Sequence, residues 1–241
     1  MAKASSRAPV LGPAYIRLLA RFSAADLPRT PPALTEQLAH WFDWNRAIAL
    51  SRALDTCAPA ATEAAFDAAE AAECARQRGV LQAAIDADID LSPPRRRDAA
   101  TGIDPGYRPY RQHCLATQQA MQATTGRLRG RLRDLLATQS PAKARLAEVD
   151  AVMDATLSPR EQSLLATVPA LLGQHYLRLR EAGTPDPPRT PGADAPDDSP
   201  AAPDAGPWLA RFRQDMRTAL LAELELRFHP IDGLLAALRT R

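Results

Sequence analysis

Residues 107–139 read YRPYRQHCLATQQAMQATTGRLRGRLRDLLATQ, and their apolar side chains recur with the most regular period in the chain. At about 100° per residue these side chains fall within a stripe about 100° wide, which is the pattern of a helix that buries one face. The stripe contains Tyr107, Tyr110, Cys114, Met121, Leu128, Leu132, Leu135 and Leu136. This stretch predicts a long amphipathic helix and an all-α fold.

The composition of the whole chain favours the same class. Its 241 residues are rich in Ala, Leu and Arg, with 11 Gly and 5% aromatic residues, and β-branched residues are sparse. Ala, Leu and Arg are among the best helix formers. With 46% hydrophobic and 24% charged residues, the chain can bury one sizeable core.

Opposite charges separate along the middle of the sequence. Residues 61–91 read as an Ala-rich helix with seven acidic residues and two arginines, a net charge of −5, whereas residues 95–145 carry eleven basic and three acidic residues, a net charge of +8. We therefore predict that helices 61–91 and 107–139 pair antiparallel within the molecule and bury the Tyr110–Leu136 stripe. Two other uses of the basic residues stay open, namely contacts with a partner protein or membrane surface, and contacts with nucleic-acid phosphates. The candidate phosphate contacts are Arg127, Arg129, Arg131 and Arg133.

Prolines and hydroxyl residues mark the expected helix boundaries. A first helix is expected from Pro13 to about Ala25. Ser140 and Ser158 each precede a proline, so both are predicted to cap the starts of helices. Pro169 is expected to kink the helix that ends at Gly183. Together these elements predict an antiparallel helix bundle over residues 8–183.

The sequence WFDW at 41–44 places two tryptophans close together. Trp41 and Trp44 form either the aromatic centre of the core or an exposed patch that docks a partner. Large aromatic side chains bury most of their area when they can, so we favour the core.

A tract at 184–206 separates the bundle from the C-terminal segment. It contains seven prolines and five aspartates, and no apolar residue larger than Ala or Pro. Such a segment buries too little area to offset its ordering entropy, so we predict a disordered acidic linker.

The C-terminal segment, residues 207–241, has the pattern of an amphipathic helix broken at His229–Pro230. Its large apolar residues recur every four positions, so the apolar line turns by about 40° at each step and the helix should be enclosed from more than one side. Either this segment folds back on the bundle or a partner holds it. The long linker favours a partner, with docking residues Trp208, Phe212, Met216, Leu220, Leu224 and Phe228.

The sequence contains no motif typical of an enzyme, a cofactor site or a metal site. Asp86, Asp88 and Asp90 match the start of a calcium loop, but Leu91 stands where glycine is needed. His113–Cys114 has no second pair at metal-ligand spacing. We expect a protein that is not an enzyme and that has no cofactor, no metal and no catalytic residue.

Two features bear on the compartment. No stretch approaches the roughly 18 apolar residues that cross a bilayer, and the N-terminus lacks the apolar region of a signal peptide. The three cysteines are widely spaced and lie in helix-like contexts, which fits a reducing environment. We expect a cytoplasmic protein without a transmembrane segment.

Four stretches carry a family resemblance: SRAPVLGPAYIRLLARFSAADLP at 6–28, LTEQLAHWFDWNRAIALSRAL at 34–54, LSPREQSLLATVPALLGQHYLRLRE at 157–181 and FRQDMRTALLAELELRFHPIDGLLAALR at 212–239. They resemble an uncharacterised proteobacterial family filed as a domain of unknown function, which has no assigned activity. The resemblance transfers no functional residue. It implies a cytoplasmic accessory of a cell-envelope assembly.

These patterns lead to two functional hypotheses. The first is a non-catalytic adaptor or scaffold that binds another, unidentified protein through the C-terminal segment and through Trp41 and Trp44. The second is a nucleic-acid-associated protein that uses the Arg-rich helix 107–139. The oligomeric state does not follow from the sequence.

Overall fold

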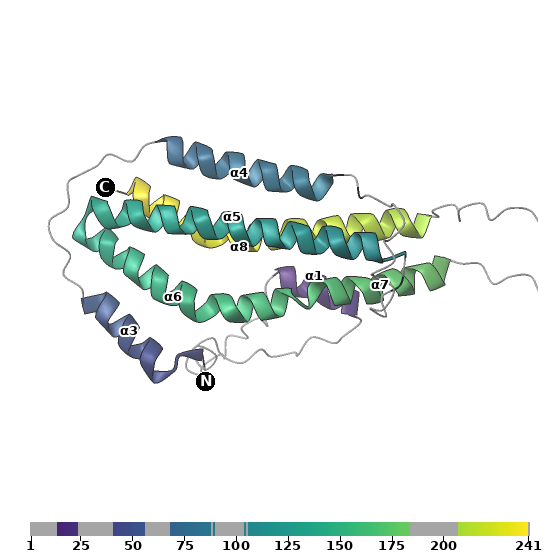
Figure 1. Cartoon of the computed structure of the whole chain (residues 1–241), viewed down its shortest axis with the longest axis horizontal. Helices are drawn as coiled ribbons and strands as arrows, with labels where there is room; N and C mark the ends of the chain where they lie inside the picture. The colour runs from purple at the N-terminus through teal and green to yellow at the C-terminus, as the bar shows by residue number, and fades with distance from the viewer. Residues whose placement is uncertain are drawn as a thin grey trace, which may run out of the picture.

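The computed structural model describes residues 14–23, 41–55, 68–87, 89, 104, 106–183 and 207–240. These residues form a packed bundle of helices without strands, so the predicted all-α class is confirmed (Figure 1). The predicted linker at 184–206 lies outside the described residues. The helices are α1 (Ala14–Ser23), α3 (Trp44–Asp55), α4 (Ala68–Asp86), α5 (Arg108–Gln139), α6 (Pro141–Leu165), α7 (Val168–Gly183) and α8 (Pro207–Arg239).

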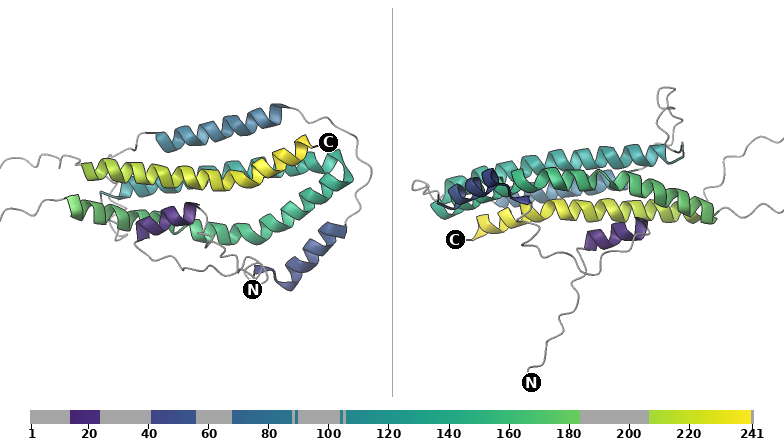
Figure 2. Two further views of the ribbon diagram at one scale, coloured as in Figure 1. Left: turned by 180° about the vertical axis from the view of Figure 1, so that it is seen from behind. Right: turned by 90° about the horizontal axis from the view of Figure 1, so that it is seen from below.

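Helices α5 to α8 give the bundle its length. The chain reverses at Ser140, whose hydroxyl accepts a hydrogen bond from the backbone N–H of Lys143 at 3.3 Å, so α6 returns along α5. Helix α7 continues the direction of α6, and α8 runs antiparallel to α7 (Figures 1 and 2). Helix α8 is therefore parallel to α5. The helix start predicted at Ser140 is confirmed.

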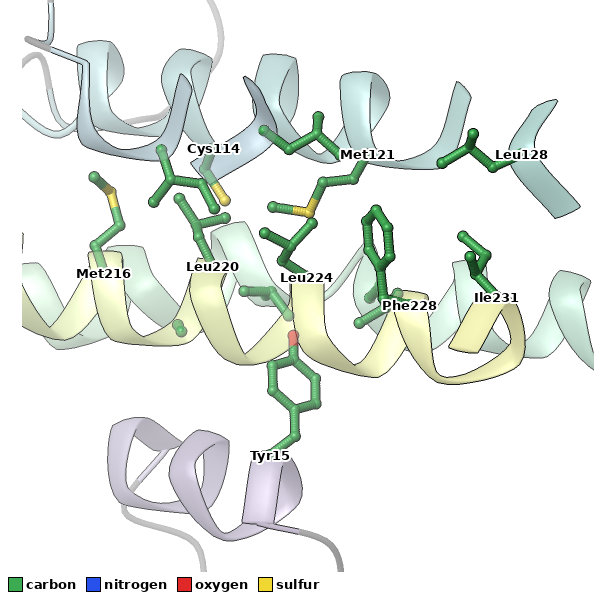
Figure 3. Packing of buried hydrophobic residues seen from close by; sticks show 14 of the residues in the cluster. Tyr15, Cys114, Met121, Leu128, Met216, Leu220, Leu224, Phe228 and Ile231 are labelled. Carbon is green, nitrogen blue, oxygen red and sulfur yellow. The ribbon is translucent and has the colours of Figure 1, made fainter. Parts of the chain in front are cut away.

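The core lies mainly between α5 and α8. The apolar stripe of α5 is buried, apart from the half-buried Leu135, and it meets the apolar residues of α8 along the length of both helices (Figure 3). Met121 and Leu128 on α5, for example, face Leu224 and Phe228 on α8 (Figure 3). The stripe is buried as predicted, but its main partner is α8 and not the acidic helix α4.

Helix α4 packs on both α5 and α8, and its charged residues form ion pairs with each of them. Glu70 at the start of α4 accepts a hydrogen bond from Arg131 of α5 at 2.5 Å, and near the other end Asp86 accepts one from Arg217 of α8 at 2.6 Å. The first pair joins the start of α4 to the last third of α5, so these helices are antiparallel as predicted. The acidic residues of α4 therefore pair partly with the basic residues of α5 and partly with those of α8.

Helix α8 is part of the core of this bundle. It contacts α1, α4, α5 and α7, and its large apolar side chains are buried among them. A Cβ atom added to Gly183 would come within 2.7 Å of Trp208, so the end of α7 requires glycine where α8 begins. The expectation that a partner covers this segment is therefore corrected, because the bundle itself covers it. The predicted enclosure from several sides is confirmed.

The helix start predicted at Pro159, the helix break predicted at Pro230 and the kink predicted at Pro169 are wrong. Pro159 lies inside α6 and Pro230 lies inside α8, and both helices continue through them. A proline inside a helix removes one hydrogen bond and bends the helix, but packing against neighbours can preserve the helix on both sides. The helix is instead interrupted at Ala166–Thr167, the two residues between α6 and α7. Pro169 therefore occupies the first turn of α7, where proline is tolerated.

An aromatic cluster holds α5, α7 and α8 together at one end of the bundle. Tyr110 and Tyr176 each meet the ring of Phe212 edge to face, with centroids 5.2 and 5.1 Å apart. The ring of Tyr107 packs on α7 at Gly173, where an added Cβ would lie 2.8 Å from the ring, and the Tyr107 hydroxyl donates to the carbonyl of Pro169.

None of the described helices combines the length and apolar composition needed to cross a membrane.

Candidate functional site

A buried carboxylate lies in the middle of the core. Glu223 of α8 is fully buried, although its neighbours on the same face are Leu220 and Leu224. Its Oε2 accepts hydrogen bonds from Gln118 Nε2 at 2.8 Å and from the Tyr15 hydroxyl at 3.4 Å, and Figure 3 shows Tyr15 of α1 pointing toward α8. A buried carboxylate is costly unless it is hydrogen-bonded and paired with a cation. These contacts tie α1, α5 and α8 to one point.

The cation that balances Glu223 comes from the next turn of α8. Arg227 donates from Nε to Glu223 Oε1 at 2.9 Å, and its side chain is only 8% exposed. Its Nη1 also lies 3.8 Å from Oε1 of Glu161 on α6. Arg227 therefore connects the buried carboxylate to a second acidic group nearer the surface.

That second group lines a cavity of about 540 Å³ between α5, α6 and α8. Small residues leave space for it, since an added Cβ on Gly126 would meet nothing within 4 Å. The cavity is partly open to solvent, and nine of its fourteen lining residues are polar or charged. The lining residues are Gln122, Thr125, Gly126, Arg129, Arg133, Ala151, Asp154, Ala155, Ser158, Pro159, Glu161, Gln162, Arg227 and Pro230.

Ion pairs between α5 and α6 form one end of the cavity. Arg129 donates to Asp150 through two nitrogens at 2.8 and 2.7 Å, and to Asp154 through its third at 2.7 Å. Arg133 donates to Asp154 at 3.2 Å and lies 3.8 Å from Asp150. The Arg129 contact is bidentate and largely shielded from water, which is the geometry in which such pairs hold best.

Burial controls the ionisation of the groups around this site. It raises the pKa of the Cys114 thiol to about 12, and the negative charge of Glu223 adds to the effect. Burial likewise raises the pKa of the Tyr15 hydroxyl, which lies against Glu223, and the pKa of the Glu161 carboxyl. Tyr15 and Cys114 are therefore neutral near pH 7. Among the described residues, no group of three or more His, Cys, Asp or Glu side chains could hold a metal ion.

The predicted docking residues of the C-terminal segment lie inside the bundle. Five of the six are buried, and Trp208 is half-buried with its ring 5.2 Å from that of Tyr176. These side chains are therefore committed to the core of the chain.

The two tryptophans at 41 and 44 have different surroundings. Trp41 is half-buried, with the guanidinium of Arg160 lying 5.4 Å above its ring and Arg160 Nη1 donating to its backbone carbonyl at 3.3 Å. Trp44 is 79% exposed. The core placement that we favoured is therefore wrong for Trp44, and the docking alternative stays a prediction.

The four predicted phosphate contacts separate onto two sides of α5. Arg129 and Arg133 turn to the acids of α6, and Arg131 turns to Glu70 of α4. Arg127 donates to Thr124 on its own helix at 3.2 Å. Residues four apart lie on one side of a helix and residues two apart do not, so these arginines do not form one surface.

Sequence reasoning missed Gln118, Glu161 and Glu223 as site residues. A signal for two of them was present, because Gln118 lies four residues after Cys114 and three before Met121, inside the apolar stripe. Glu223 lies three residues after Leu220 in the same way. A polar residue at a core position of two separate helices indicates a buried polar contact, since each needs a partner.

Comparison with known proteins identifies the family of the chain and nothing beyond it. No curated protein and no solved structure matches the chain. A family profile, described as "Protein of unknown function (DUF3348)", matches residues 1–240. The resemblance to a family without an assigned activity is thus confirmed, and the chain belongs to the DUF3348 family.

Proposed function

We propose that this chain is a non-catalytic adaptor that binds another protein through the outer side of α3. The observation that carries the proposal is the exposure of Trp44, of which 79% is accessible. Nine residues at about 100° each place Trp44 on the opposite side of α3 from Ala53, the buried residue of that helix. Trp44 therefore points away from α6, against which α3 packs (Figure 1).

The charges near Trp44 suggest the chemistry of the partner. Arg46 and Arg52 of α3 are balanced by Asp55 and by Asp43, which caps the helix by accepting from the N–H of Arg46 at 2.8 Å. Such a surface exerts little long-range attraction on a charged partner. A tryptophan is a frequent centre of binding energy when it enters an apolar pocket. We therefore propose a partner protein with an apolar pocket that accepts the indole.

The alternative proposal, binding of nucleic acid by the Arg-rich helix, has less support. Three of its four arginines are paired with carboxylates of α4 or α6. Phosphate contacts would have to compete with those pairs. For the setting of the interaction, we retain the proposal of a cytoplasmic role beside a cell-envelope assembly, which follows from the family resemblance alone.

A photo-crosslinking experiment in the producing cells tests the adaptor proposal. A photoreactive phenylalanine analogue replaces Trp44 in the full chain, and a matched variant carries it in place of Val80, an exposed residue of α4. We expect a discrete protein adduct from position 44 and not from position 80. Capture of that protein should be lost in Trp44→Ala, kept in Val80→Ala, and little changed by high salt.

Three outcomes would contradict this assignment. Equal adducts from both positions would show that the helix α3 surface has no special role. An adduct formed only with a second copy of the chain would make the surface a dimer contact. Capture that disappears with nuclease or with salt would favour the nucleic-acid alternative.

A further inference from the structure

A second cavity, of about 470 Å³, lies between the end of α4 and the first third of α8, and we call it the α4–α8 cavity. Its lining has an apolar part and a charged part. Ile85, Ile89 and Met216 supply large apolar side chains, and Ile85 and Met216 are themselves buried. Arg213 and Arg217 supply guanidinium groups, and they lie on the same side of α8 because they are four residues apart.

The charges of this lining do not cancel. Asp86 is the one acid among the described lining residues, and Arg217 donates to both of its carboxylate oxygens, from Nε at 2.6 Å and from Nη2 at 3.2 Å. These hydrogen bonds lower the pKa of Asp86, so this carboxylate stays ionised near pH 7. No carboxylate of the described residues forms an ion pair with Arg213. Arg213 therefore carries the one positive charge of the lining that lacks a counterion there.

The guanidinium of Arg213 is held in place by a buried tyrosine of α5. Its Nε and Nη2 donate to the Tyr110 hydroxyl at 3.2 and 3.1 Å, and Tyr110 is only 2% exposed. A guanidinium has five N–H donors, so Nη1 and the second N–H of Nη2 make no hydrogen bond to a described residue. Two such neighbouring donors match the two oxygens of a carboxylate. Because Tyr110 already fixes the group, less side-chain entropy is lost when an anion binds.

We propose that the α4–α8 cavity binds a small monocarboxylate with an apolar body, such as a medium-chain fatty acid. Its carboxylate accepts hydrogen bonds from Arg213, and its alkyl chain lies against Ile85, Ile89 and Met216. One negative charge on the ligand balances the one unmatched cation of the lining. The volume of about 470 Å³ is in the range of small-molecule sites.

The same lining argues against other ligands. The second charge of a dianion would have no cation to meet, because Arg217 is committed to Asp86. An ammonium group would meet a lining with two arginines against one aspartate. The α4–α8 cavity uses no residue of α3, so it stands or falls independently of the adaptor proposal.

Calorimetric titration of the full chain with sodium octanoate tests the inference, with n-octanol and octylammonium chloride as controls that have the same alkyl chain. We expect octanoate to bind more tightly than octanol, and octylammonium not to bind. Affinity should rise severalfold from butanoate to octanoate as more CH₂ groups are buried. Arg213→Gln should weaken octanoate binding about tenfold or more, because hydrogen bonds between charged groups are lost. Arg211→Gln removes the same charge at an exposed position of α8 outside the lining, and it should bind like the wild type.

The methyl group of Met216 provides a readout in the wild-type chain. Carbon NMR should show that octanoate shifts the signal of this methyl, which lines the cavity, and leaves that of Met153 on α6 unchanged. This measurement also decides the case if Arg213→Gln does not fold. No detectable octanoate binding, equal binding by Arg213→Gln, equal affinity for octanol, binding of octylammonium, or an unshifted Met216 methyl would each overturn the proposal.

Discussion

A chain that ends at Gly183, without α8, should not fold. Nine large apolar side chains of α8 are buried with at most 6% exposure, and each stabilises the fold by about 1.5–3 kcal/mol when fully buried. Their loss removes about 14–27 kcal/mol, whereas a domain is stable by only about 5–15 kcal/mol in total. They are Phe212, Met216, Leu220, Leu224, Phe228, Ile231, Leu234, Leu235 and Leu238.

Thermal and urea unfolding followed by circular dichroism measure the effect. The expected result is loss of the cooperative transition, with recovery when a peptide of residues 207–241 is added. The control replaces residues 184–206 by a Gly/Ser sequence of equal length, which changes the connection but keeps every α8 side chain. If the shortened chain melts cooperatively within a few degrees of the full chain, α8 is not part of the core and our account of the fold fails.

Three further predictions concern single residues. Glu223→Ala should lower the free energy of unfolding by about 3–5 kcal/mol because it leaves Arg227 buried without its partner, and urea titration should show recovery in Glu223→Leu/Arg227→Met. Leu132→Asp, at a site 1% exposed, should cost several kcal/mol by burying an unpaired charge, and an unchanged melting temperature would contradict this. Burial raises the pKa of Cys114 from 9.0 to about 12, so the unfolded thiol loses its proton first and stability should fall as pH rises above about 9. Urea unfolding below and above this pH should show a smaller loss in Cys114→Ala.

Much of the fold could be predicted because helix periodicity is a local property. The apolar stripe of α5 and the Ser140–Pro141 helix start depend on residues within a few turns of each other, so both are visible in the sequence. The proline boundaries were less predictable. Pro159 and Pro230 stay inside helices that have buried residues on both sides of the proline, and no local sequence pattern reports that packing.

The candidate site depended on contacts between residues far apart in the chain. Glu223 meets Tyr15 and Gln118 across 208 and 105 residues, and the cavity forms where three helices converge. The opposite charges of 61–91 and 95–145 suggested that these segments pair, yet Arg129 and Arg133 turn to α6 because the α5–α6 hairpin places Asp150 and Asp154 beside them.

The sequence by itself determined that the chain is helical and which face of each long helix is apolar, because both follow from residue spacing along one helix. Only the tertiary structure decided what covers each face. The tertiary structure places α8 in the core and Trp44 outside it, although large apolar side chains made both candidates for burial in the sequence. The physical reason is that hydrophobic burial has no direction of its own, so the partner of an apolar face is chosen by how all the helices pack together.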